Sequence, residues 1–278
     1  MDVHLSWNIA DDIRQLLQFP FMVNALRAGI IVAVVAGAIG YLMVLRRQSF
    51  AGHTMAVVGF PGAAAALWIG INPVFGFYAF CVAAALAIAA LPETAAAESA
   101  GIGTVQAFAL ACGLLFVSLF HGFQGGLTTL LFGTIVGVTD VQVRALLVAG
   151  ALSLGVLAVL GRRLLFATVD PDAARARGVP IRLIGAAFLV LLGVAAAATS
   201  QVTGSLLVFA LLVAPAATAV RLTANPRTGV VLSVAVALVV TLLGESVAYF
   251  SPYPVGFWVT TFGFGAFLMA SGWRWLGR

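Results

Sequence analysis

Apolar runs of about twenty residues recur along the whole chain, and they restrict it to folds that place these runs in a hydrophobic medium. As a helix, a run of this length crosses the roughly 30 Å hydrocarbon core of a bilayer. Hydrophobic residues make up 63% of the chain and charged residues only 8%, a composition far outside that of soluble domains. The sequence therefore predicts an all-α integral membrane protein.

The apolar runs and the breakers between them predict a polytopic bundle of eight or nine transmembrane helices within a single transmembrane domain, residues 1–278. The candidate spans are residues 21–45, 54–70, 75–91, 104–120, 141–160, 183–199, 204–222, 229–250 and 255–275. A further apolar run, residues 123–137, is interrupted by glycines and is predicted to be a re-entrant or tilted segment. Because the first span is too long for the apolar region of a signal peptide, we expect no cleavable leader.

All 14 basic residues are arginine, and their distribution orients the helices by the positive-inside rule. In the nine-span arrangement, most arginines fall on one side of the membrane: Arg46, Arg47, Arg162, Arg163, Arg175, Arg177, Arg182, Arg221, Arg227, Arg274 and Arg278. Only Arg14, Arg27 and Arg144 fall on the other side. The first side is therefore predicted to be cytoplasmic. The net charge of +5 reflects this topology and gives no support to a nucleic-acid partner.

One polar segment, residues 161–182, interrupts the membrane-like sequence on the predicted cytoplasmic side. It carries the signals of a helix start, charges that complement the helix dipole, and a helix stop, in the order Asp170, Pro171, Asp172, Arg175, Arg177, Gly178 and Pro180. These signals predict a helix of about two turns, which is too short to be stable without a surface to dock on. A solvated connecting loop is the alternative interpretation.

Two residue types limit the chemistry of the chain. Lysine is absent, which excludes a P-loop ATPase because the lysine of that loop reaches the nucleotide phosphates. Cys81 and Cys112 lie far apart in apolar spans without the spacing of metal ligands, so we expect buried structural thiols.

Glu245 is the one acidic residue that lies clearly inside a predicted span. A carboxylate in the bilayer costs at least about 2.5 kcal/mol, so Glu245 is expected to face a cavity, a partner or a proton. A solvated position near the interface is the alternative, because the Ser251-Pro252 turn follows soon after.

Histidine could supply a nitrogen ligand to a divalent cation at two places. His53 begins the second span, and His121 lies on the predicted outer side, where it could meet an arriving metal ion. A capping or hydrogen-bonding role is the alternative for His53. His4 lies in an N-terminal segment that we expect to be mobile or interfacial.

Two spans carry proline among small residues, at Pro61 and Pro215. Both helices are expected to be kinked or broken near the middle of the membrane. They run in opposite directions in the predicted topology, a pattern typical of inverted repeats in transporters, whose substrates bind near such breaks. Close packing through small residues is the plainer alternative.

Four segments together carry a resemblance: "LRRQSFAGHTMAVVGFPGAA" (residues 45–64), "LLFGTIVGVT" (130–139), "DPDAARARGVP" (170–180) and "LLVFALLVAPAATA" (206–219). In order and spacing, from Phe21 to Trp275, the chain resembles the permease subunits of the zinc, manganese and iron uptake ABC transporters. The resemblance implies a homodimer of permeases, separate ATP-binding cassette subunits that hold the ATP, and an extracytoplasmic metal-binding protein. It implies a bacterial inner membrane location and a coupling helix in a groove of the ATPase, formed by Asp170, Pro171, Ala174, Arg175, Gly178 and Val179.

The sequence departs from the family pattern at the metal site. Such permeases commonly have "GDALSH", whereas this chain has "GHTMAV", so that His53 replaces the aspartate and Val57 replaces the histidine. The resulting hypothesis is a non-enzymatic permease that transports a divalent metal, with zinc favoured over manganese or iron, and that holds no covalent cofactor. His53, Glu245 and His121 are its candidate metal ligands. The alternatives are an ion-coupled secondary transporter that uses Glu245 and a membrane scaffold without transport activity.

Overall fold

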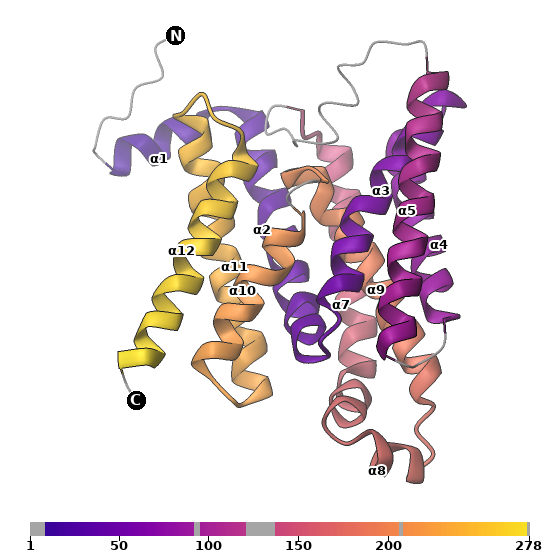
Figure 1. The fold of residues 1–278 in the computed structure, drawn as a ribbon. Helices are drawn as coiled ribbons and strands as arrows, with labels where there is room; N and C mark the ends of the chain where they lie inside the picture. The colour runs from indigo at the N-terminus through magenta and orange to yellow at the C-terminus, as the bar shows by residue number, and fades with distance from the viewer. Residues whose placement is uncertain (1–8, 92–94, 121–136, 206–207, 277–278) are drawn as a thin grey trace.

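The structure, a computed structural model, describes residues 9–91, 95–120, 137–205 and 208–276. In these ranges the regular secondary structure is entirely α-helical (Figure 1). The helices are α1 (Ile9–Gln18), α2 (Pro20–Leu45), α3 (Ser49–Trp68), α4 (Pro73–Ala89), α5 (Ala95–Leu119), α7 (Asp140–Val169), α8 (Pro171–Ala176), α9 (Ile181–Thr203), α10 (Val208–Leu222), α11 (Pro226–Tyr249) and α12 (Val255–Leu276). The predicted re-entrant segment and His121 lie outside the described residues, apart from Gly137.

Each predicted span corresponds to one helix of the described chain, which confirms the all-α polytopic membrane fold. Seven helices are long and apolar enough to cross a membrane, by length and composition. The apolar helices α4 and α10 are shorter, with 17 and 15 residues. At 15 residues α10 rises about 22 Å, less than the hydrocarbon thickness, and it follows closely on the end of α9.

The end of α7 next to α8 differs from the prediction. This helix has 30 residues and continues to Val169, whereas the predicted span ended at residue 160. Arg162 and Arg163 continue the helix because arginine has a high helix propensity. The first part of the polar segment is therefore an extension of α7 rather than a loop.

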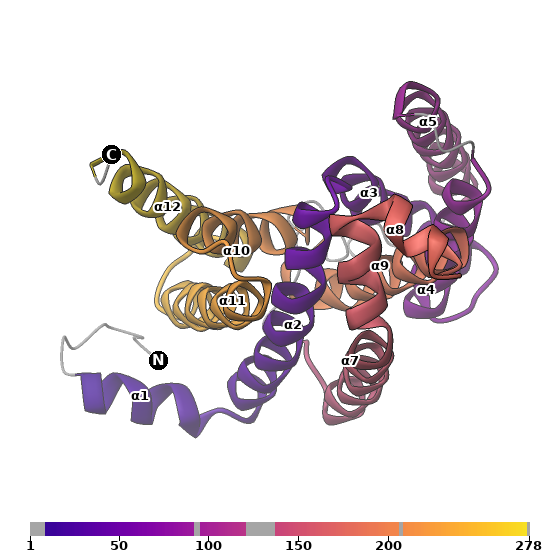
Figure 2. The same ribbon diagram turned by 90° about the horizontal axis from the view of Figure 1, so that it is seen from below.

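Helix α2 lies at the centre of the bundle. Seen from below, it separates a group formed by α10, α11 and α12 from a group formed by α3, α4, α5, α7 and α9 (Figure 2). In the apolar 18-residue stretch of each helix, 72% of the stretch is buried in α2 and 67% in α3, but only 17% in α5 and in α7. Helices α2 and α3 therefore form the interior, and α5 and α7 keep surfaces for lipid or for other subunits.

Small residues bring the central helices close together. Gly62 in α3 and Gly76 in α4 face each other so closely that a Cβ on either would collide with the backbone oxygen of the other. Between α2 and α11, the Ser233 hydroxyl donates a hydrogen bond of 2.7 Å to the carbonyl oxygen of Gly37. These contacts are typical of membrane helix interfaces, where van der Waals packing replaces the hydrophobic effect as the driving force.

Pro61 and Pro215 lie inside α3 and α10, and both helices continue through them. The break that the sequence allowed at each proline is therefore absent. The ring of Pro61 packs against α5, where a Cβ on Gly113 would lie 2.9 Å from the proline Cγ. This contact supports the helix at the place where proline removes a backbone hydrogen bond.

The two ends of the bundle differ in charge as predicted. The α2–α3 turn, α8 and the α10–α11 turn lie at one end, and α1 lies at the other (Figure 1). The first end carries most of the arginines, including Arg46, Arg47, Arg175 and Arg177. Because α3 leaves this end and α10 arrives at it, the two proline-containing helices run in opposite directions, as the predicted topology required.

Candidate coupling helix and ion pathway

Helix α8 begins and ends at the residues that the sequence indicated. The Asp170 carboxylate accepts a hydrogen bond of 2.9 Å from the backbone N–H of Ala173, and Pro171 occupies the first turn. At the other end Gly178 has a φ of +74°, its N–H donates to Arg175 O, and the N–H of Val179 donates to Ala174 O. This pair of bonds is a Schellman motif, which satisfies the last carbonyl groups of the helix. The helix interpretation of the polar segment is confirmed.

One side of α8 is seated on its own chain. Ala174 has 0% exposed surface, and the guanidinium carbon of Arg177 lies 5.5 Å from the ring centroid of Phe166 in α7. The burial of Ala174 contradicts a direct contact of this side chain with a partner, because the side chain turns inward to seat α8. Between Asp170 and Val179, the exposed residues are Asp170, Pro171, Asp172, Arg175, Ala176, Arg177 and Gly178.

His53 lies one turn inside α3, where it is half-buried. Its ring packs edge-on against Phe209 at the start of α10, with 5.2 Å between the ring centroids. Val57 and Phe60, which follow on the same face of α3, are also half-buried, whereas most of the helix is buried. This face is the part of α3 that the single chain leaves least covered.

The described residues do not assemble a metal site around His53. Among them, no group of three or more histidine, cysteine, aspartate or glutamate side chains could hold an ion. The neighbouring Thr54 hydroxyl is used within the chain and donates a hydrogen bond of 2.9 Å to Gln106 Oε1 in α5. His53 can therefore be at most one ligand of a site that other oxygen atoms, water or a second subunit complete.

Glu245 has 0% exposed surface, which is inconsistent with the solvated alternative. It faces α2, where a Cβ on Gly29 would lie 2.6 Å from the glutamate Cδ. Neither carboxylate oxygen has a hydrogen-bond partner, and the hydroxyls of Thr241 and Tyr249, four residues away on either side, also lack one. A buried carboxyl group without a partner is costly, so this stripe of α11 is a candidate functional element.

His53 and Glu245 are not brought together. Helix α2 lies between α11, which carries Glu245, and α3, which carries His53 (Figure 2). The two prolines also lie in different surroundings: Pro61 contacts α5, and Pro215 is buried in α10. Of the sequence-predicted ligands, His53 and Glu245, the two in the described part of the chain, thus lie at separate helix interfaces.

The sequence reasoning missed a chain of polar groups at the ends of α4, α7 and α9 that lie away from α8. Gln142 Nε2 donates to Gln201 Oε1 at 3.0 Å, and Gln201 Nε2 donates to the Tyr78 hydroxyl at 3.2 Å. These residues line a cavity of about 390 Å³ together with Asn72 and Thr139. The available signal was the presence of two glutamines at the ends of apolar spans.

A multi-pass helical bundle with a short capped helix on its arginine-rich end is the architecture of a membrane transport subunit. Residues 18–273 match the ABC 3 transport family, and the chain belongs to this family. It is a non-catalytic permease subunit rather than an enzyme.

Similar proteins cover nearly the whole chain. The manganese import system permease protein ScaB of Streptococcus gordonii is 30% identical over 87% of each chain. The chelated iron transport system membrane protein YfeD of Yersinia pestis is 28% identical over 83% of this chain and 78% of that protein. The structure is similar to PsaBC of Streptococcus pneumoniae, solved in complex with a Fab, with a TM-score of 0.84, 27% identity and coverage of 94% of this chain and 95% of that one.

Proposed function

We propose that the chain is the permease of an ATP-driven importer for a divalent metal ion in a bacterial inner membrane, with manganese as the favoured ion. The single observation that carries this proposal is the family match over residues 18–273, and the short capped helix at the arginine-rich end supports it. In this function α8 binds an ATP-binding cassette subunit that hydrolyses ATP. An extracytoplasmic binding protein delivers the metal at the other end.

Manganese is favoured because the relative with 30% identity is named for manganese import. Iron is the second choice, since a relative with 28% identity is named for chelated iron. Zinc, which the sequence resemblance favoured, has weaker support. Zinc prefers about four nitrogen or sulfur ligands, whereas manganese accepts carboxylate, carbonyl and water oxygens. One half-buried histidine with no clustered partner in the described residues fits a transient, oxygen-rich pathway better than a zinc site.

The pathway is proposed to lie along the half-buried face of α3 that carries His53 and Val57. A second copy of the chain, related by two-fold symmetry, would cover this face and double the number of ligands. His121 would meet the ion on the outer side. Glu245 remains a candidate ligand only if the helices around α2 rearrange, because its carboxylate lies in a different interface.

In the proposed cycle, ATP-driven closure of the partner subunits displaces α8 through its exposed residues, Asp170, Pro171, Asp172, Arg175, Ala176, Arg177 and Gly178. The spans that contain Pro61 and Pro215 then tilt, and the pathway alternates between outward and inward exposure.

The test is uptake by proteoliposomes that contain the permease, its ATPase and its binding protein, with manganese, iron and zinc supplied separately. We expect ATP-dependent manganese uptake that requires the binding protein. Uptake of zinc alone would overturn the choice of ion, and failure of the ATPase to co-purify with the permease would overturn the importer itself.

An ion-coupled carrier is the second candidate, and the buried, unpartnered Glu245 is the observation that favours it. A proton-coupled carrier needs a titratable carboxyl group, so Glu245→Gln would abolish uptake driven by a pH gradient in vesicles that contain this chain alone. For the importer we expect no such uptake from the wild-type chain alone. In the complete complex, Glu245→Gln is expected to retain ATP-dependent transport.

A further inference from the structure

Arg46 lies where the membrane helices meet the region of α8, and it contacts three separate elements. Its Nε donates a hydrogen bond of 3.2 Å to Gln48 Oε1, and its Nη1 donates one of 3.1 Å to Thr168 Oγ1 near the end of α7. The guanidinium carbon lies 5.3 Å from the ring centroid of Phe188 in α9. One side chain therefore joins the turn after α2 to α7 and to α9.

Two of these contacts lie on the helices that hold α8. Thr168 is two residues before Asp170, the N-cap of α8, and Phe188 lies on α9, the helix that follows α8. The Thr168 hydroxyl donates to Leu164 O at 2.6 Å while it accepts from Arg46, so its orientation is determined from both sides. A displacement of α8 moves the end of α7 or the start of α9, and in either case it moves a partner of Arg46.

The third contact lies at the start of α3. Gln48 is the N-cap residue of this helix, but its side chain makes no cap hydrogen bond and accepts from Arg46 instead. His53 follows five residues later in the first turns of α3. The position of Gln48 thus determines where the helix with the proposed pathway residue begins.

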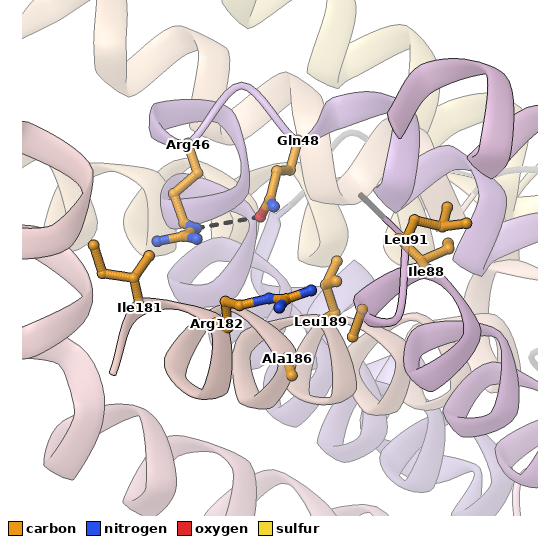
Figure 3. Close-up of a pocket in the computed structure, with 10 residues that line it drawn as sticks. Arg46, Gln48, Ile88, Leu91, Ile181, Arg182, Ala186 and Leu189 are labelled. Carbon is orange, nitrogen blue, oxygen red and sulfur yellow. Dashed lines mark hydrogen bonds between the residues drawn. The ribbon is translucent and has the colours of Figure 1, made fainter. Parts of the chain in front are cut away.

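The space beside this junction is not closely packed. Arg46 and Gln48 border a cavity of about 150 Å³, and Leu91, two residues after the end of α4, and Arg182 from α9 lie across it (Figure 3). On α9, a Cβ at Gly185 would lie 3.7 Å from Arg46 Nη2. With a cavity on this side, directional polar contacts rather than close packing hold the α2–α3 turn in register with α7 and α9.

We propose that Arg46 is a positioning residue that transmits the movement of α8 to α3. The proposal rests on the proposed function of α8 as the docking helix for an ATPase. A guanidinium group suits the role because its planar fork donates in several directions at once and stacks on an aromatic ring, whereas a lysine ammonium cannot reproduce this geometry. The route of transmission runs from α8 through Thr168 and Phe188 to Arg46, and from Gln48 into α3.

The chain offers a matched control in the neighbouring Arg47, which has the same charge, lies in the same turn and is exposed. Proteoliposomes with the ATPase and binding protein would compare Arg46→Met with Arg47→Met. We expect Arg46→Met to bind the ATPase normally and to lose at least about tenfold of both uptake and binding-protein-stimulated ATP hydrolysis. Arg47→Met is expected to stay within about twofold of the wild type. Full coupling in Arg46→Met, or an equal defect in both variants, would overturn the proposal.

Thr168→Val provides a second test that keeps the side-chain shape and replaces the hydroxyl with a methyl group, so it applies even if Arg46→Met fails to accumulate. We expect Thr168→Val to lower both uptake and binding-protein-stimulated ATP hydrolysis, and Arg46→Met/Thr168→Val to be no worse than Arg46→Met, because both changes cut the same connection. Arg46→Lys is expected to restore only part of the coupling. Full coupling in Thr168→Val, or multiplicative defects in the double variant, would contradict the route. If the wild-type chain binds no ATPase, the proposed function fails before this comparison begins.

Discussion

The arginine-rich end of this protein and the Glu245 stripe of α11 differ in how their polar side chains are paired. At the arginine-rich end, Asp170 caps α8, Arg46 donates two hydrogen bonds, and Arg177 stacks over Phe166. In the interior, Glu245 and Thr241 have no exposed surface, and their side-chain oxygens lack a hydrogen-bond partner.

This difference separates two kinds of polar group. The hydrogen-bonded groups hold a fixed local geometry, whereas the buried groups without a partner are expected to gain one in another conformational state. Most buried polar groups in proteins are hydrogen-bonded, and a buried carboxyl group in a membrane is costly. The partnered residues around α8 are therefore expected to keep their contacts with one another and to move together during transport. The unpartnered residues of α11 are expected to gain a partner, such as an ion, a proton or water, in another state of the cycle.

The largest effect is expected from a matched pair of substitutions in α8. Ala174 is buried and Ala176 is exposed, so arginine at the first position displaces α8 from its seat, whereas at the second it only obstructs a docking partner. We expect both variants to lose uptake. Ala174→Arg should also lower the melting temperature of the detergent-solubilised permease. Ala176→Arg should keep the wild-type melting temperature but fail to co-purify with the ATPase. Normal ATPase binding by Ala176→Arg would reject the docking face.

A steric test of the interior comes next in magnitude. A Cβ on Gly29 would lie 2.6 Å from the Cδ of Glu245, so Gly29→Ala forces the carboxyl group out of its place. We expect a destabilisation of about 2 kcal/mol, seen as a lower melting temperature. The companion variant Gly29→Ala/Glu245→Ala should recover part of that loss, because the clash is removed. A double variant as unstable as the sum of the single variants would show that the two residues do not constrain each other.

A smaller effect is expected at His53. If its imidazole is a transient ligand, His53→Ala should reduce uptake about tenfold at limiting metal and much less at saturation, which corresponds to about 1.4 kcal/mol of ion binding. Concentration dependence of uptake and protein abundance should be measured together. A packing role against Phe209 predicts the reverse pattern, with normal apparent affinity and reduced abundance.

The smallest effect is expected in the α2–α3 turn. Arg47 has a φ of +58°, in the left-handed region that favours glycine. Arg47→Gly removes the steric strain of the Cβ but increases the entropy of the unfolded chain, so we expect a net stabilisation of about 0.5 kcal/mol. A thermal melt would measure it, and a clear destabilisation would indicate that the Arg47 side chain makes contacts that stabilise the turn.

Signals that act within a few residues were sufficient for much of this fold. The length of each apolar run predicted a membrane span, and the order from Asp170 to Gly178 predicted a helix with the observed start and stop. These predictions succeeded because hydrophobic length and backbone capping depend on neighbours in the sequence. The extension of α7 was missed because arginine signals the end of a membrane span but does not end a helix.

Tertiary structure alone decided which neighbour each side chain meets. The sequence places Ala174 in a short capped helix, but only the packing of α8 against the bundle turns that side chain inward. From the sequence, Glu245 could be either solvated or buried. It is buried because α2 packs closely against its carboxyl group at Gly29. The connection of Arg46 to Thr168 spans 122 residues of sequence, and no local pattern encodes such a contact. By itself the sequence determined a multi-pass membrane protein with a capped helix on its arginine-rich side, because those features follow from local chemistry. Packing between distant helices decided the rest.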